Sequence, residues 1–301
     1  MVAVVLATDH TEISRISTDL SVGNCCLFIG ARMSNSRPIG VFDSGIGGLT
    51  VVRAMTHHLP HENIVYFGDT ARVPYGPKSS QVVREYAAQD TEVLLEHNVK
   101  MIVIACNTVS AVALDVVQKR AKVPVVGVIL PGAGAAARAT TKKRVGVIGT
   151  IGTVNSNAYV NALRQFDPAI QAFSAACPLF VPLAEEGWTD HKATELIAKE
   201  YLFPLTLEKI DTLILGCTHY PLLKDVIGRV LHQSVTLIDS GEATAETVKQ
   251  MLDALGMRNA SKLKPNLQFN VSDVPHRFTE VGERFLGQKL GRVHRVAGLG
   301  A

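Results

Sequence analysis

Two apolar segments of this chain each lead into a cysteine that is followed by small polar residues. Residues 101–105 lead into Cys106, and residues 213–215 lead through Gly216 into Cys217. A short, uniformly apolar run is typical of a strand that is buried on both faces, as in a parallel sheet. Because parallel strands are joined by crossovers that are usually helices, the two segments predict an α/β fold.

The rest of the chain continues this alternation. Apolar runs and helical spacing predict strands at residues 39–42, 64–67, 101–105 and 123–128, and helices at 49–59 and 82–97. In the second half, residues 144–150 resemble 39–44. Residues 211–215 resemble 101–105, after a nearly equal interval along the chain. Matching elements at a repeated interval predict two duplicated halves, related by a pseudo-two-fold axis.

The sequence therefore predicts two pseudo-symmetric α/β domains with mostly parallel central sheets and an active site in the cleft between them. Helices at 244–255 and 277–286 and a strand at 267–271 have no counterpart in the repeat, so we expect them to fold onto the first domain. The predicted division is 37–129 plus 241–296 for the first domain and 130–240 for the second.

Residues 1–36 lack clear periodicity, and we interpret them as an N-terminal extension, partly disordered or loosely docked. A passive tail or a misassigned start codon explains them equally well. The apolar run that opens the chain is short and has no basic region before it, so it is not interpreted as a signal peptide.

Composition excludes several classes of protein. The chain has 301 residues, 47% of them hydrophobic and 19% charged, which is typical of a globular protein and not of a disordered one. Its formal charge of +3 comes without a dense basic run, so no nucleic-acid partner is indicated. No apolar run is long enough to span a membrane. The five cysteines, an odd number without framework spacing, favour the reducing cytoplasm.

The two cysteines predict a chemistry as well as a fold. A single cysteine after an apolar strand is usually an inert buried residue. Two in matching positions at strand ends, where helix N-termini stabilise thiolates, are harder to explain by packing alone. Thiols that face one pocket from opposite sides could remove a proton from one face of a carbon and deliver one to the other face. That is the chemistry of an amino-acid racemase that needs no cofactor.

Each cysteine has a candidate assistant. His219 lies two residues after Cys217 and could accept or return its proton. Asp43 ends the first predicted strand, in the half that holds Cys106, and could act in the same way there. The alternatives are that Asp43 only caps the following helix and that His219 is a structural hydrogen-bond donor.

Other motifs are less specific. The glycine-rich segment 43–48 could hold a carboxylate through its backbone amides, but it lacks a complete dinucleotide-binding pattern. The loop 68–76 could close over a ligand or be an ordinary loop tip. Cys217 and His219 do not have a usual zinc spacing, and no lysine is distinguishable as a pyridoxal ligand, so neither a metal nor a cofactor is predicted.

Four segments together resemble one family, glutamate racemase. They are VFDSGIGG (41–48), PYG (74–76), ACNT (105–108) and GCTHYP (216–221), and the resemblance runs from about residue 37 to about 296. The family has two α/β domains with the site between them, uses no cofactor, and interconverts L- and D-glutamate, the latter for peptidoglycan synthesis and hence for cell-wall biogenesis and cell shape.

The resemblance also implies roles for residues. It makes Cys106 and Cys217 the two bases, with Asp43 and His219 assisting them and Glu185 near His219. The substrate-binding residues that it implies, Asp43 and His219 among them, also include Ser44, Tyr75, Gly76, Asn107, Thr108, Thr150 and Thr218. Some relatives have an N-terminal extension and respond to a cell-wall precursor as activator, and many are homodimers. This extension shows no matching motif, and the sequence indicates no interface.

Several alternatives stay open. A related two-cysteine enzyme could act on aspartate or another acid, and side-chain length discrimination does not follow from the sequence. A related decarboxylase would use one catalytic cysteine, which the pair disfavours. A non-catalytic amino-acid-binding protein of the same shape would leave the two thiols unexplained. Inhibition of DNA gyrase, ascribed to some relatives, is neither supported nor excluded.

Overall fold

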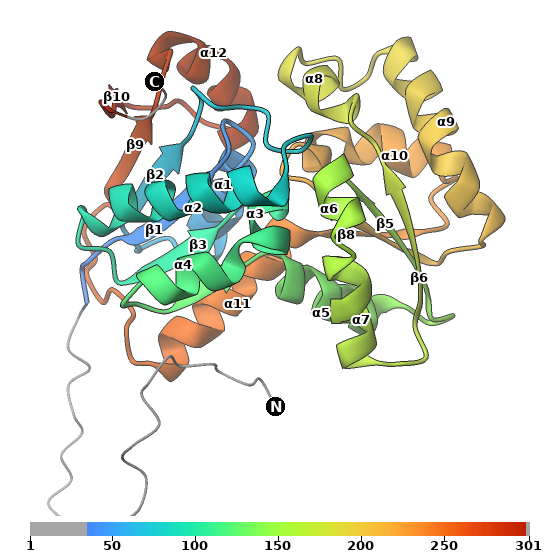
Figure 1. The fold of residues 1–301 in the computed structure, drawn as a ribbon, viewed down its shortest axis with the longest axis horizontal. Helices are drawn as coiled ribbons and strands as arrows, with labels where there is room; N and C mark the ends of the chain where they lie inside the picture. Colours follow the sequence, from blue (N-terminus) through green and yellow to red (C-terminus); the bar gives the residue numbers. More distant parts are fainter. Residues whose placement is uncertain (1–34, 299–301) are drawn as a thin grey trace, which may run out of the picture.

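The computed structural model describes residues 35–298 and arranges them around two β-sheets that lie side by side (Figure 1). All neighbouring strands within both sheets are parallel. The first sheet has six strands in the order β10-β9-β2-β1-β3-β4, and the second has four in the order β6-β5-β7-β8. The predicted α/β class with two central sheets is confirmed.

The elements of the first half follow one another as strand and helix. They are β1 (Ile39–Asp43), α1 (Leu49–His58), β2 (Ile64–Gly68), α2 (Ser80–Leu95), β3 (Met101–Ile104), α3 (Asn107–Val112), α4 (Leu114–Arg120) and β4 (Val125–Gly127).

The second half repeats the pattern. Its elements are α5 (Ile129–Ala139), β5 (Arg144–Gly149), α6 (Ile151–Asn155), α7 (Ala158–Phe166), β6 (Gln171–Ala176), α8 (Phe180–Glu185), α9 (Lys192–Leu207), β7 (Thr212–Gly216), the 3₁₀ turn η1 (Tyr220–Leu223), α10 (Lys224–Val230) and β8 (Thr236–Asp239). A last group comprises α11 (Ser240–Ala254), β9 (Leu267–Val271), α12 (Pro275–Leu286) and β10 (Val293–Arg295).

Both halves have the same strand order. The second, first, third and fourth strands of each half lie next to one another in that order, as β2-β1-β3-β4 and β6-β5-β7-β8. This agreement supports the duplication inferred from sequence. In a doubly wound sheet of this order, the crevice at the carboxyl ends of the first and third strands is where ligands bind. Cys106 follows β3 and Cys217 follows β7, so the two cysteines occupy equivalent crevices.

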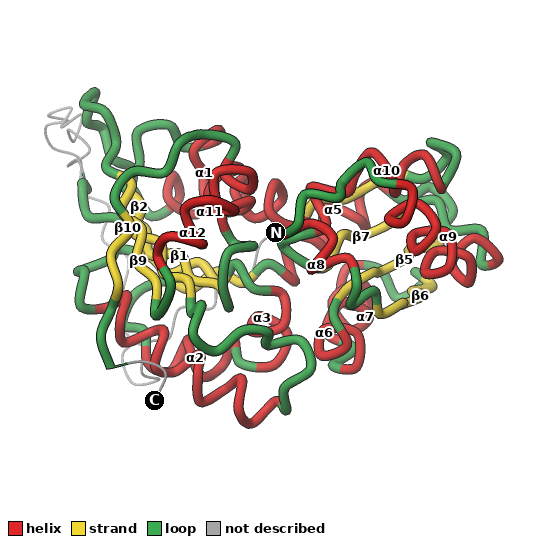
Figure 2. The backbone as a smooth tube through the Cα atoms, turned by 90° about the horizontal axis from the view of Figure 1, so that it is seen from above, coloured by secondary structure: helices red, strands yellow, loops and turns green. Residues whose placement is uncertain are grey.

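Helices cover both faces of the first sheet (Figure 2). One face carries α1, α11 and α12, and the other carries α2 and α3. Every residue of β1, β2 and β3 is buried, which explains their uninterrupted apolar sequences. The last elements join this sheet, since β9 pairs with β2 from Ile64↔Leu267 to Gly68↔Val271. We propose the domain division at about residues 130 and 240 on this sheet membership, because α5 and α11 begin there.

The structure differs from the sequence prediction at element ends, in short strands and in the helices α5, α8, α9 and α10 of the second half, which were not predicted. Helix α11 begins at Ser240 instead of 244, because the Asp239 carboxylate accepts hydrogen bonds from the amides of Gly241 (2.9 Å) and Glu242 (3.4 Å). Strands β6 and β10 were not predicted. The first has few β-branched residues, and the second is only three residues long. The predicted extension falls almost wholly outside the described residues, as do Cys25 and Cys26.

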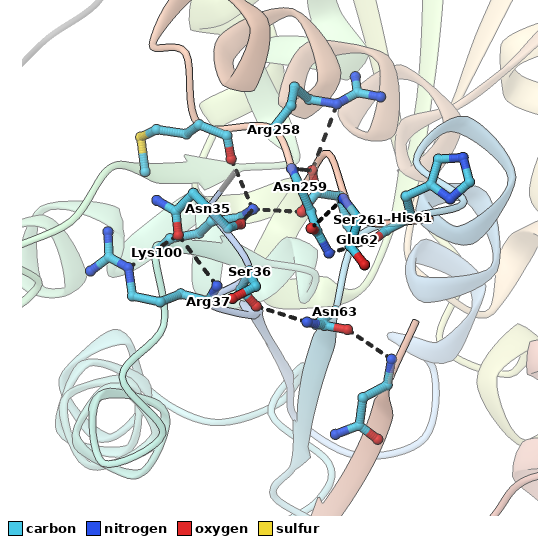
Figure 3. A network of polar contacts seen from close by, with 12 residues as sticks. Asn35, Ser36, Arg37, His61, Glu62, Asn63, Lys100, Arg258, Asn259 and Ser261 are labelled. Atoms are coloured by element: carbon cyan, nitrogen blue, oxygen red, sulfur yellow. Dashed lines mark hydrogen bonds and ion pairs between the residues drawn. The ribbon is translucent and has the colours of Figure 1, made fainter. Parts of the chain in front are cut away.

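A buried ion pair joins four chain segments at the amino-terminal edge of the first sheet (Figure 3). The Lys100 ammonium contacts Glu62 Oε2 at 2.6 Å and donates to the carbonyls of Asn35 (2.6 Å) and Met257 (2.8 Å). The second Glu62 oxygen accepts from the Asn259 amide at 2.8 Å. Both charged side chains are almost fully buried, 0% and 1% exposed. The network fastens the segments before β1 and after α11 to the strands between them.

We predict that Lys100→Met destabilises the protein by about 3–5 kcal/mol, because it leaves the Glu62 carboxylate buried without its close cation. The midpoint of urea unfolding measures this loss. Adding Glu62→Gln should recover part of it, since a neutral amide still accepts from Asn259. The control, Lys199→Met, removes an exposed pair with Glu195 and should cost less than about 1 kcal/mol. Equal effects of the two lysine variants would contradict the prediction.

None of the helices formed by residues 35–298 combines the length and the apolar composition needed to cross a bilayer.

Candidate active site

Strand ends from both halves line one small cavity of about 40 Å³. Cys106 enters it from the end of β3, and Cys217 enters it from the end of β7. The predicted crevices of the two sheets thus form a single site. Its lining residues are Ser44, Pro74, Tyr75, Gly76, Cys106, Asn107, Thr108, Thr150, Val181, Cys217, Thr218 and His219.

The first-half side of the cavity places Cys106 beside Ser44, with the Asp43 carboxylate nearby. The Cys106 thiol donates to Ser44 Oγ at 3.7 Å. Burial and the negative charge of Asp43 raise the pKa of Cys106 to about 12, so this cysteine is a thiol at neutral pH. Asp43 is 1% exposed, and burial raises its pKa although the Gly45 amide donates to Oδ2 at 3.0 Å.

The second-half side forms a chain of three groups. Cys217 Sγ lies 3.8 Å from His219 Nδ1, and His219 Nε2 lies 3.0 Å from Glu185 Oε1. Burial alone would lower the pKa of His219, but its hydrogen bonds with Cys217 and Glu185 outweigh burial and raise it to about 10. Burial would raise the pKa of Glu185, and the contact with His219 lowers it instead. A charged imidazolium is therefore held between a carboxylate and a sulfur.

Uncharged donors make up much of the remaining wall. Thr108 Oγ1 lies 2.9 Å from Thr150 Oγ1, so one hydroxyl from each half meets there. Tyr159 donates to Asn107 Oδ1 at 2.7 Å and fixes the side-chain amide of Asn107. The Nδ2 of Asn107 has no hydrogen-bond partner within residues 35–298. A buried donor without a partner is costly, and a ligand carboxylate would satisfy it.

Tyr75 lines the cavity, as expected. Its hydroxyl hydrogen-bonds with Asp69 and with Asp90, the latter at 3.1 Å. Arg72 pairs with the same two carboxylates, at 2.6 and 2.9 Å. This buried cluster fixes the loop, and the Gly76 carbonyl accepts from the Gly152 amide of the other half at 2.9 Å. Tyr75 thus lines the cavity while its hydroxyl is held in this buried cluster.

The two halves approach so closely that one position requires glycine. A Cβ on Gly47 would lie 2.1 Å from Thr218 Oγ1 and 2.5 Å from the His219 ring. Three residues further on, Thr50 Oγ1 donates to the Thr218 carbonyl at 2.9 Å. The glycine-rich segment therefore lets the first half dock against the residues that follow Cys217.

The structure brings most of the sequence-predicted residues together. Asp43 lies beneath Ser44 and does not itself line the cavity, and Glu185 reaches it only through His219. Sequence reasoning missed two lining residues, Pro74 and Val181. Pro74 lies within the PYG segment that was recognised, whereas Val181 comes from α8 and carries no sequence signal. Among the described residues, no group of three or more His, Cys, Asp or Glu side chains could hold a metal ion.

A family model described as Asp/Glu/Hydantoin racemase matches residues 47–248, more than half of the chain. The chain belongs to the Asp/Glu/Hydantoin racemase family. A glutamate racemase from Chlorobaculum tepidum is 52% identical over 266 residues, covering 88% of this chain and 98% of the relative.

Solved structures of the family agree with this fold. Glutamate racemase from Francisella tularensis, in complex with D-glutamate, matches with a TM-score of 0.82 at 43% identity, covering 87% of this chain and 98% of that one. The Escherichia coli glutamate racemase, in complex with L-glutamate and the activator UDP-MurNAc-Ala, matches with a TM-score of 0.73 at 30% identity, covering 87% and 98%.

For this family member we predict that His219 keeps its proton to about pH 10, against about 6.5 for a free histidine. NMR titration of the imidazole measures the midpoint. Glu185→Gln should lower it, because the variant removes a charge that favours the imidazolium. The neighbouring control Glu186→Gln, whose side chain pairs with Arg277 instead, should leave it unchanged.

The same shift has a consequence for stability. The folded-state pKa of His219 lies above its unfolded value, so its charge contributes stability that is complete below about pH 6.5 and is lost as the pH rises through about 10. A wild-type midpoint near that of a free histidine would contradict both statements.

We also predict that Gly47→Ala destabilises the protein by about 1–3 kcal/mol, because the added methyl group overpacks the junction between the halves. Urea unfolding measures the loss. The control is Gly291→Ala, where an added Cβ would meet no atom within 4 Å. Equal midpoints for the two variants would show that the junction can yield.

Proposed function

We propose that this protein racemises glutamate without a cofactor, by proton transfer at the α-carbon between two bases, Cys106 and Cys217. The observation that carries the proposal is their convergence. Two cysteines from equivalent strand ends of duplicated halves line one small cavity. A base on each side of the α-carbon is the minimum that inversion of its configuration requires.

The proposed reaction needs one thiolate and one thiol. The thiolate takes the α-proton and becomes a thiol, and the electron pair left on the α-carbon is shared with the carboxyl group. The opposite thiol then gives its proton to the other face and becomes the thiolate. Nothing is oxidised or reduced, and the site ends with its two sulfur charge states exchanged. The reverse reaction uses the same groups in the opposite order.

The two cysteines are supported by different groups. His219, held protonated by Glu185, lies 3.8 Å from Cys217 Sγ and is suited to stabilise a negative sulfur or to return a proton to it. Asp43 lies on the Cys106 side, and the pKa of both groups is raised there. A neutral Asp43 carboxyl could donate a proton, and an ionised one could accept it. We propose Asp43, His219 and Glu185 as the assisting residues.

The lining fits an acidic amino acid that is held by uncharged donors. Ser44, Thr108, Thr150 and Thr218 offer hydroxyl groups, and the free Nδ2 of Asn107 adds an amide donor. Among residues 35–298, no lysine or arginine lines the cavity. We therefore propose that the substrate carboxylates bind these hydroxyl groups, the Asn107 amide and the backbone amides near Gly76.

Substrate entry requires the site to widen. A cavity of about 40 Å³ holds about three water molecules and not an amino acid. The contacts between the halves that cross it are few and specific, such as Thr108 to Thr150 and Gly152 to Gly76. We propose that the halves separate to admit glutamate and close again to exclude water during proton transfer.

The choice of glutamate rests on relatives, since the family description also names aspartate and hydantoin. Curated glutamate racemases match almost their whole length at about half identity, and the Francisella structure holds D-glutamate. We propose that the D-glutamate formed here supplies peptidoglycan synthesis in the cytoplasm. A homodimer, and activation by a cell-wall precursor like that in the Escherichia coli structure, stay predictions.

Incubation with L-glutamate in D₂O, without added cofactor, tests the proposal. We expect the α-proton signal to disappear while D-glutamate accumulates, as followed by NMR and optical rotation. Cys106→Ser and Cys217→Ser should each lower the rate by about 10²–10⁴-fold, the usual contribution of a general acid or base.

The control variant is Cys177→Ser. Cys177 is also buried at the end of a strand, but it does not line the cavity, so most of the activity should remain. Exchange with L-aspartate alone would keep the two-base mechanism and overturn glutamate as substrate. Tight glutamate binding without exchange would indicate a binding protein and overturn the enzyme proposal.

A further inference from the structure

Helix α12 belongs to the first sheet's layer of helices but reaches the second half of the molecule. It packs on α1, and its far side faces α8 across the gap between the two sheets (Figure 1). Helix α8 ends at Glu185, the partner of His219. Two residues of α12, Arg284 and Phe285, contact these two groups directly.

Phe285 sets the orientation of the His219 ring. The two rings meet edge to face, with centroids 5.1 Å apart and planes at 79°. Phe285 is fully buried, so the contact leaves the imidazole little freedom to rotate. That orientation decides the chemistry, because Nδ1 must face Cys217 while Nε2 faces Glu185.

Arg284 sets the position of Glu185. Its Nη1 donates to the Glu185 carbonyl at 2.7 Å. Its guanidinium also packs on Gly187, where a Cβ would lie 2.8 Å from the central carbon and where φ is +76°. The turn after α8 is therefore shaped to receive this arginine. The Glu185 backbone is held from the first half, although its carboxylate serves a histidine of the second half.

The support on the Cys106 side is less direct. Asp43 is held by the Gly45 amide of its own loop at 3.0 Å. The α12 residue Phe278 packs its ring on Tyr66 at 5.9 Å, and Tyr66 donates to the Gly45 carbonyl at 2.8 Å, so α12 reaches this loop through a second residue. The duplicated halves are thus unequal, since α12 has no counterpart in the second half.

We propose that Arg284 and Phe285 are positioning residues for the proton transfer at Cys217, and that they do not serve the transfer at Cys106. The proposal rests on the proposed two-base racemisation. Because both residues come from the first half, the relay of Cys217 is assembled only when the two halves are closed on each other.

The proposal makes the two directions of reaction unequal in a measurable way. If the step at Cys217 slows, breaking the α-C–H bond becomes more rate-limiting for the enantiomer that Cys217 deprotonates. For the other enantiomer, the slow step becomes reprotonation, so bond breaking limits the rate less. The ratio kcat/KM must fall equally in both directions, because the enantiomers have equal free energies. The isotope effects therefore carry the distinguishing information.

The test compares Phe285→Leu with wild type, using α-deuterated L- and D-glutamate. We expect kcat/KM to fall by about 10-fold to 10²-fold, as for a displaced catalytic group. The primary isotope effect on kcat/KM should rise for one enantiomer and fall for the other. Isotope effects on the residual activity of Cys217→Ser identify the enantiomer for which the effect rises. Phe285→Leu should show a rise for the same enantiomer. Cys106→Ser should show the opposite pattern.

Two further variants separate positioning from folding. Phe278→Leu makes the same change on the same helix, at a residue that is 1% exposed, without touching His219. It should not reproduce the pattern of Cys217→Ser. Arg284→Met should reproduce it more weakly than Phe285→Leu, and Arg284→Lys, which keeps a donor for the Glu185 carbonyl, should restore part of the rate.

The outcomes distinguish the two proposals. A wild-type protein that does not exchange the α-proton of glutamate overturns the proposed function and this inference with it. A wild-type protein that racemises glutamate, with isotope effects that change alike for both enantiomers in Phe285→Leu and Phe278→Leu, overturns only the positioning role.

Discussion

Burial of ionisable groups at the junction of the two halves is the constraint on which the rest of this site depends. The buried ionisable residues are Asp43, Cys106, Cys217 and His219. A buried charge must be paired with an opposite charge or hydrogen-bonded, or the group shifts its pKa toward the neutral form. The site uses both solutions. Cys106 is held as a thiol by burial and by Asp43, whereas His219 keeps its proton because Glu185 and Cys217 lie on either side of it. The two cysteines therefore lie in electrostatically different surroundings.

Duplication supplies the frame of the site, and departures from duplication supply its chemistry. Equal strand orders bring β3 and β7 to equivalent positions, so Cys106 and Cys217 leave their sheets at equivalent edges, and the docking of the halves brings both into one cavity. Their supporting groups do not correspond. One cysteine has a carboxylate from the end of β1, and the other has a histidine two residues along its own loop. The added helix α12 increases the difference, because Phe285 packs on the histidine's ring and Arg284 donates to the backbone carbonyl of Glu185.

The sequence predicted the α/β class, the repeat and the two cysteines, because uniformly apolar strands and strand-end motifs are local signals. Most of the other cavity residues were implied by the resemblance to glutamate racemases. The sequence predicted helix ends less well, as at α11, where the capping hydrogen bonds of Asp239 decide the first turn. Val181 was missed entirely. This residue of α8 reaches the cavity through the packing of segments far apart in the chain, which a residue pattern cannot name.

The sequence by itself determined where Cys106 and Cys217 lie, since a cysteine after a buried parallel strand must emerge at the carboxyl edge of its sheet. Only the tertiary structure decided how those residues behave. The pKa of Cys106 and of His219 depends on burial and on Asp43 and Glu185, which are remote in sequence. The close docking at Gly47 and the contacts of α12 likewise exist only when the halves meet. Strand direction is a local property of the chain, whereas desolvation and charge pairing arise from the packing of both halves.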